Sequence, residues 1–188
     1  MDMNKLMSVG KEILAKSQNV NLDGDMKDAH QEANSQAGAS GNSDLFANVL
    51  GSLSQQQSQI AEAPHVDEQD AVEKHEAAYN NDNNNASHDA NSLGTAAAMQ
   101  ALKMFNQRGG DQNQSQGAFI GTALSEASKL FDDKSANGQV PSGTSKENVL
   151  QKAGEMAMKM YFKSQMDAGG SGGSAGNLMN LASKFLNK

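Results

Sequence analysis

The sequence predicts an all-α protein. We expect a small helical bundle of about four short repeated helices at residues 93–188, preceded by a largely disordered acidic region with short amphipathic helices at residues 1–92. Two kinds of pattern predict helices: apolar residues recur at helical spacing in several segments, and the second half contains an internal repeat. Leu, Ile, Val and Phe make up only 30 of the 188 residues, and residues 1–88 carry a net charge of −9 against +2 for residues 89–188. Because fewer than roughly 20% of residues are of these four types, only part of the chain is expected to fold.

Two amphipathic helices are predicted early in the chain. In residues 2–17 the apolar side chains, Leu6 and Ile13 among them, recur at intervals of three and four and share one face of a helix. In residues 43–58 an apolar stripe follows Ser43, which is suited to be the N-cap. Neither stripe is large enough to fold alone, so each is expected to dock on the bundle, on a second copy or on another protein.

The remainder of the first half is expected to bury little. Residues 67–79 are predicted to form a marginal, solvated helix, because only Val72 and Tyr79 are available for burial. Residues 17–42 contain three large aliphatic side chains and residues 80–91 contain none, so both stretches are predicted to be disordered.

The second half repeats a short pattern of Ala, any residue, Lys and two large apolar residues. Spacings of 25 to 30 residues suit one helix and one connection per repeat, and Gly-rich or polar connections separate the units, including a predicted Gly-rich linker at 168–176. Thr144 and Glu147 predict a capping box for the third unit. The four copies of the pattern begin at Ala101, Ala127, Ala157 and Ala182.

These repeats resemble a family of small fungal proteins of unknown function, sometimes labelled beta-flanking proteins. The resemblance covers residues 93–188. It implies no known activity, cofactor or catalytic residue. The segments that carry it are residues 95–105, 116–121, 127–132, 152–161 and 178–186.

Composition argues against several functional classes. A net charge of −7 disfavours nucleic acid as a partner. The chain has no Cys, which removes thiolate chemistry and fits a cytoplasmic protein, with the nucleus as an alternative. No apolar run is long enough to predict a transmembrane segment. Contact with a membrane surface through residues 2–17 is a weaker hypothesis, because Asp2 and Glu12 lie within that helix.

One segment resembles part of a calcium-binding loop. Asp133, Ser135 and Asn137 occupy the first, third and fifth positions of the EF-hand pattern, but Thr144 stands where a bidentate Glu is needed. The alternative is a polar turn with Gly138 in the left-handed conformation, and we therefore predict no bound metal and no cofactor.

No catalytic motif stands out, so we do not expect an enzyme. The primary hypothesis is a non-enzymatic helical interaction or assembly protein that binds a protein partner or itself. The alternative is a hydrophilic stress-protectant protein that is partly disordered. Met158 and Phe162 lie off the main stripe of their helix, which makes that helix either central in the bundle or a binding surface. The candidate interaction residues are Leu6, Ile13, Leu45, Phe46, Val49, Leu50, Met158 and Phe162.

Overall fold

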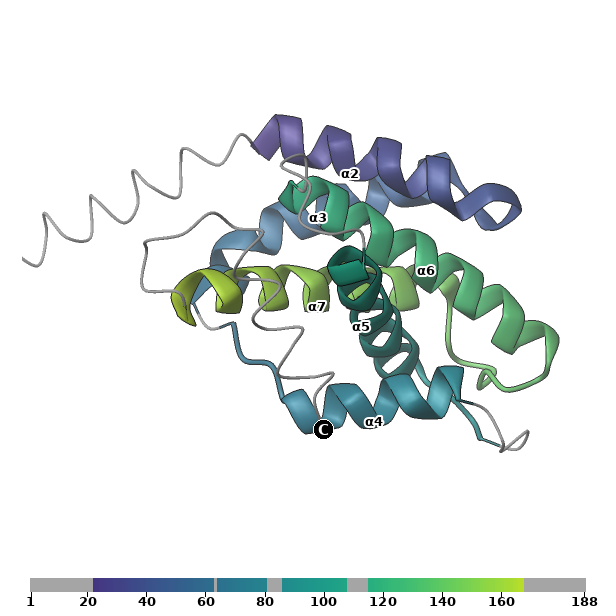
Figure 1. Ribbon diagram of the computed structural model, residues 1–188. Coiled ribbons are helices and arrows are strands. Elements are labelled where there is room, and N and C mark those ends of the chain that lie inside the picture. The colour runs from purple at the N-terminus through teal and green to yellow at the C-terminus, as the bar shows by residue number, and fades with distance from the viewer. Residues whose placement is uncertain (1–21, 63, 81–85, 108–114, 168–188) are drawn as a thin grey trace, which may run out of the picture.

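The computed structural model describes residues 22–62, 64–80, 86–107 and 115–167, and over these ranges the protein is all-α (Figure 1). The predicted helix at 2–17, the linker at 168–176 and the repeat unit that begins at Ala182 lie outside these ranges. The described elements are α2 (Leu22–Ala37), the short 3-10 helix η1 (Gly38–Ser40), α3 (Ser43–Glu62), α4 (Glu68–Tyr79), α5 (Ala90–Gln107), α6 (Gln116–Ala136) and α7 (Lys146–Asp167).

Helix α5 lies at the centre of the bundle. It contacts α4, α6 and α7 (Figure 1), and ten of its 18 residues are buried, on more than one side. Contacts with three helices account for the burial on more than one side of α5. The Phe105 ring packs edge-on against the ring of Phe119 on α6, with the ring centroids 5.2 Å apart. Gly94 lets the α5 backbone lie against α7, because a Cβ added at Gly94 would lie 2.5 Å from the Cβ of Lys152.

The first three repeat units form helices α5, α6 and α7, as predicted. The Ala that opens each pattern is fully buried, at Ala101, Ala127 and Ala157. The Lys two residues later is half-buried in each unit. The repeat therefore marks the places where these helices pack closely, with the Lys stem lying along the bundle and its ammonium able to reach water.

Helices α3 and α4 pack on the second half of the chain. Helix α3 contacts α7, where Leu53 is fully buried and its side chain lies against Gly154. Helix α4 contacts α5 and buries Ala71 and Ala78. The sequence hypothesis overlooked these two alanines because it weighed only large side chains. The described residues before residue 93 thus share one core with those after it.

Helix α2 is the largest departure from expectation, because residues 17–42 were predicted to be disordered. It packs along α6 with small residues on both sides. Ala29, Ala33 and Ala37 are buried on α2. Opposite them, a Cβ added at Gly121 would lie 2.5 Å from the Ala29 carbonyl oxygen, and one at Gly117 would collide with the Asp25 carbonyl. Close backbone approach replaces large side chains as the source of contact here.

Two predicted helix starts are displaced by one residue. Asn42, rather than Ser43, caps α3: its Oδ1 accepts a hydrogen bond from Leu45 N at 3.1 Å. Ser145, rather than Thr144, caps α7: its Oγ accepts one from Asn148 N at 3.2 Å. Asn42 and Ser43 are both good N-cap residues, and so are Thr144 and Ser145. The sequence therefore does not distinguish the two neighbours, and the path of the preceding chain decides which one caps the helix.

Candidate functional site

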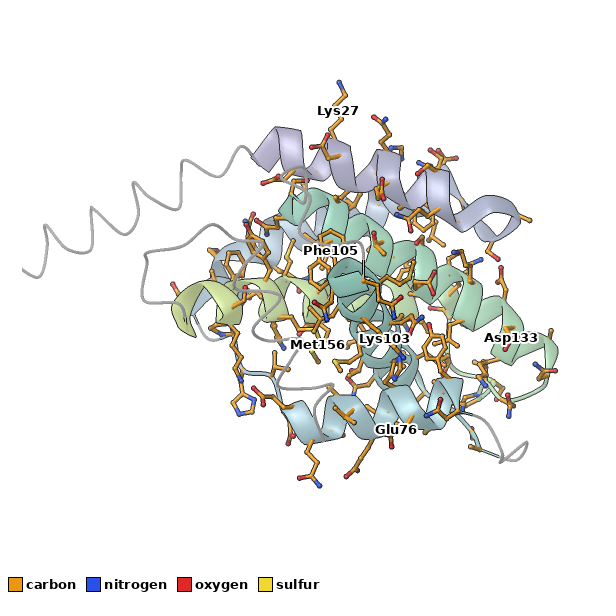
Figure 2. The ribbon with its side chains drawn as sticks, viewed as in Figure 1. Lys27, Glu76, Lys103, Phe105, Asp133 and Met156 are labelled. Atoms are coloured by element: carbon orange, nitrogen blue, oxygen red, sulfur yellow. The ribbon has the colours of Figure 1, made fainter. Side chains whose placement is uncertain are left out.

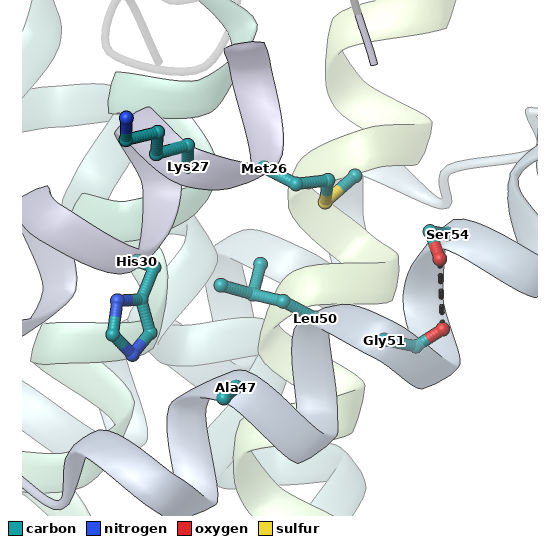
Figure 3. Close-up of a pocket in the computed structure, with 7 residues that line it drawn as sticks. All are labelled: Met26, Lys27, His30, Ala47, Leu50, Gly51 and Ser54. Carbon is teal, nitrogen blue, oxygen red and sulfur yellow. Dashed lines mark hydrogen bonds between the residues drawn. The ribbon is translucent and has the colours of Figure 1, made fainter. Parts of the chain in front are cut away.

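An open groove of about 540 Å³ lies between α2 and α3. Its α2 wall is formed by Met26, Lys27 and His30. Figure 3 shows Met26 and Leu50 reaching from opposite helices into the space between them. The α3 wall consists of Ala47, Leu50, Gly51 and Ser54.

A short turn holds the two walls together. Gly38, with φ +54°, ends α2 in the left-handed conformation that glycine adopts readily. The chain then reverses through η1 into α3. His30 Nε2 donates to the carbonyl oxygen of Ser43 at 3.0 Å, and Asn34 Nδ2 donates to the carbonyl oxygen of His30 at 2.9 Å. The His30–Ser43 bond ties α2 to the start of α3, and the Asn34 bond lies within α2, beside it.

Helices α2 and α3, with the turn between them, form a hairpin that is also anchored to the rest of the bundle. Lys146 Nζ on α7 donates to the carbonyl oxygen of Ser40 and pairs with Asp132 on α6, both at 2.9 Å. Gln36 Nε2 on α2 donates to Thr122 Oγ1 on α6 at 3.1 Å. The groove therefore lies on a supported scaffold.

The groove has an apolar floor and a polar rim. Leu50 is buried and Met26 is half-buried. Gly51 has no side chain to project from the α3 wall, which we therefore call low. A Cβ added there would meet nothing within 4 Å. Lys27 is exposed and extends away from the bundle (Figure 2). The Ser54 hydroxyl donates to the Gly51 carbonyl at 2.8 Å, the dashed line of Figure 3. Such a surface is suited to binding an apolar side-chain stripe.

A second polar cluster joins the start of α5 to the end of α6. His88, Lys134 and Gln139 are each at least 95% buried. His88 N donates to the Gln139 carbonyl at 2.8 Å, and Gln139 N donates to the Lys134 carbonyl at 2.8 Å. His88 Nε2 and both polar atoms of the Gln139 side chain have no hydrogen-bond partner. Burial lowers the pKa of His88, the Lys134 ammonium lowers it further, and Asp89 opposes the shift.

A third polar group lies between α4, α5 and α6. His75 Nε2 donates to Gln100 Oε1 at 2.8 Å, and the His75 ring stacks on Tyr79 with centroids 4.9 Å apart. Burial raises the pKa of the Tyr79 hydroxyl, and the nearby Glu126 carboxylate raises it further. These contacts fasten α4 to the bundle.

Most of the predicted interaction residues are used inside the chain. Leu6 and Ile13 lie outside the described residues, and Leu45 and Phe162 are half-buried. Of the six members that the structure describes, Leu50 alone lines the groove. The fully or nearly fully buried members are Phe46, Val49, Leu50 and Met158.

The weak calcium candidate forms a helix end. Asn137 N donates to the Asp133 carbonyl at 3.2 Å and Asn137 Nδ2 donates to the same oxygen at 2.8 Å. Gly138 has φ +70°, as the alternative of a polar turn predicts. Asp133 and Ser135 belong to the last turn of α6. Within the described residues, no three His, Asp or Glu side chains come together in a way that could hold a metal ion.

Sequence reasoning missed most of the groove. Apart from Leu50, its lining residues are small, polar or placed in a stretch that was expected to be disordered. One signal was present: Met26 and His30, like Ala47 and Gly51, stand four residues apart and share a helix face.

None of the described helices is long and apolar enough to cross a membrane.

Comparison with known proteins matches part of the chain to a family model. No curated protein and no solved structure matches the chain. Residues 25–110 match the family model of a domain of unknown function, DUF7721, and this range contains both walls of the groove.

Proposed function

We propose that this protein is a non-enzymatic helical interaction or assembly protein, and that the groove between α2 and α3 binds an amphipathic helix. The observation that carries the proposal is the groove itself: an apolar floor, a polar rim and an α3 wall kept low by Gly51. A helix that places residues at i, i+3, i+4 and i+7 on one face is the usual ligand of such a site.

The dimensions and chemistry of the groove support this ligand class. A volume of about 540 Å³ accommodates a few apolar side chains rather than a whole helix, since a helix with its side chains is roughly 10–12 Å across. The Met26 thioether can repack around different shapes. The exposed Lys27 offers a partner to an acidic residue on the flank of the bound helix.

The shared core makes the stress-protectant alternative the weaker proposal. Helices α2 to α7 bury one continuous set of apolar residues, whereas a protectant that is mostly disordered in water would not need such a core. With a net charge of −7, the interaction we propose is with protein and not nucleic acid, in the cytoplasm or, as an alternative, the nucleus.

Kinship with the fungal proteins labelled beta-flanking remains part of this proposal. The resemblance at residues 93–188 overlaps the matched domain only at residues 93–110. Its support is the repeat, whose first three units form α5, α6 and α7.

Blocking the groove tests the function. Gly51→Arg places a long charged side chain in it, and the site has room for the new Cβ. The matched control is Asn48→Arg, which adds the same side chain at an exposed α3 position outside the groove. Tagged full chains would be compared by quantitative mass spectrometry of bound proteins, and by sedimentation velocity for self-association.

We expect Gly51→Arg to reduce one bound species, a partner or a second copy, by tenfold or more. Asn48→Arg should retain it. Equal recovery with the wild type and both variants would contradict the proposal.

A further inference from the structure

We propose that the helix bound in the α2–α3 groove is the chain's own amino-terminal segment, residues 3–14, docked through its apolar stripe between Met26 and Leu50. This inference rests on the proposed function, because it treats the groove as a site for an amphipathic helix. It adds the identity of the occupant in the free chain, which the helix of a partner would have to displace.

The segment has the pattern that the groove requires. Its apolar residues follow intervals of three and four, which place them on one helical face. Gly10 falls in the middle of that face, where it would let the segment approach the low wall at Gly51 closely. The remaining stripe residues are Met3, Leu6, Met7, Ile13 and Leu14.

Chain connectivity allows this segment to reach the groove. Helix α2 begins at Leu22, and Met26 of the groove wall follows one turn later. Residues 15–21 are the connection, which spans up to about 25 Å when extended and is long enough to reverse the chain. A short tether of this kind gives an effective concentration on the order of millimolar.

The expected register also fits. Because α2 and α3 form a hairpin, with His30 bonded to Ser43, Met26 lies toward Ser54 and His30 toward Ala47. A segment that turns back along α2 would therefore place Ile13 toward Ser54 and Leu6 toward Ala47. Leu6 and Ile13 are seven residues apart in the segment, and Ala47 and Ser54 are seven residues apart in α3. Each spacing corresponds to about 10.5 Å along a helix.

Charge favours the same pairing. The hairpin at residues 22–62 holds six acidic residues and one Lys, a net charge of −5, whereas residues 2–17 hold three Lys and two acids, a net charge of +1. Opposite net charges favour association of this segment with the α2–α3 hairpin as a whole.

The carboxyl-terminal repeat unit is less well placed to compete. Lys163 in the last turns of α7 pairs with Glu68 at 2.8 Å, so α7 ends beside the start of α4. The start of α4 follows the carboxyl-terminal end of α3 at Glu62. The groove lies nearer the other end of α3, at residues 47–54.

Disulfide trapping in the full chain tests the inference, because the chain has no natural Cys. The test variant carries Gly10→Cys and Gly51→Cys, which keep every apolar anchor of the segment. One control moves the first thiol to Lys11→Cys, off the apolar stripe. The other pairs Gly10→Cys with Asn48→Cys, outside the groove. Intact mass and non-reducing gels would follow disulfide formation under mild oxidation, and circular dichroism would establish that each variant is folded.

The expected result is an intramolecular disulfide that forms at least tenfold faster in the test variant than in either control. Adding Leu6→Glu should lower that rate to the control value without loss of helix. Equal rates in all three double-Cys variants would overturn the inference, and so would disulfide-linked dimers as the main product, since the occupant would then be a second copy.

The two proposals can fail separately. If trapping fails but Gly51→Arg still removes a bound partner, the groove binds another protein's helix and only the present inference is lost. If Gly51→Arg removes nothing and trapping succeeds, the groove holds its own segment without an external ligand.

Discussion

The α2–α6 and α3–α7 contacts both join the first half of the chain to the second, but they do so with different side chains. At α3–α7 a large residue, Leu53, fills the space above Gly154. At α2–α6 the buried residues are alanines, and Gly117 and Gly121 bring one helix backbone against the other. The first contact depends on apolar area removed from water, and the second on close packing of many small atoms.

This difference shows what a count of large apolar residues can overlook. Helix α2 has little hydrophobic area of its own and would not form a stable helix alone. Against α6 its Ala29 and Ala33 are fully buried. The α3–α7 contact should therefore be the more sensitive to removal of side-chain volume, and the α2–α6 contact the more sensitive to its addition.

The largest expected effect comes from removing volume at α3–α7. Leu53→Ala should lower the free energy of unfolding by about 3 to 5 kcal/mol, because it deletes a fully buried side chain and leaves a cavity. Urea unfolding followed by circular dichroism would measure it. A loss below about 1 kcal/mol would mean that α3 contributes little to the bundle.

Adding volume at α2–α6 should cost nearly as much. Gly121→Ala should lower the free energy of unfolding by about 2 to 3 kcal/mol, because the new Cβ meets the backbone of Ala29, which cannot move without shifting α2. The control is Gly51→Ala on α3, where the new Cβ meets none of the described residues within 4 Å. That change should be markedly less destabilising than Gly121→Ala, or stabilising by up to about 1 kcal/mol. If both variants are stabilised, the close α2–α6 contact does not exist in solution.

The same Gly-to-Ala change at α3–α7 should have a smaller effect. Gly154→Ala should destabilise by about 1 kcal/mol, because the new Cβ meets the end of the Leu53 side chain, which can adopt another rotamer. Thermal unfolding of the Gly121 and Gly154 variants side by side would test the ranking. A larger loss at Gly154 would reverse the proposed distinction between backbone and side-chain contact.

A pH titration tests a contact outside both interfaces. The folded state holds the pKa of His88 below its ordinary value of 6.5, through burial and Lys134, with Asp89 opposing. Below about pH 6.5 the unfolded chain binds a proton that the folded chain does not, so stability should fall as the pH drops through this window. The melting temperature between pH 7 and pH 5 would therefore decrease more in the wild type than in His88→Gln. Parallel curves would contradict this.

The sequence alone determined the all-helical class and the places of α5, α6 and α7. Periodicity, capping residues and polar connections are local signals, and the repeat made them consistent. The stripe of α3 and the turn at Gly138 were predictable for the same reason.

Only the tertiary structure decided how the first half is used. Whether Phe46 and Val49 serve a partner or the chain's own core depends on what lies opposite them, and the structure places both in the core. Helix α2 exists because Gly117 and Gly121, about 90 residues away, admit its backbone. The groove follows from this placement. Contacts between small residues depend on complementary shape across a distant pair of helices, and no local pattern in the sequence encodes that shape.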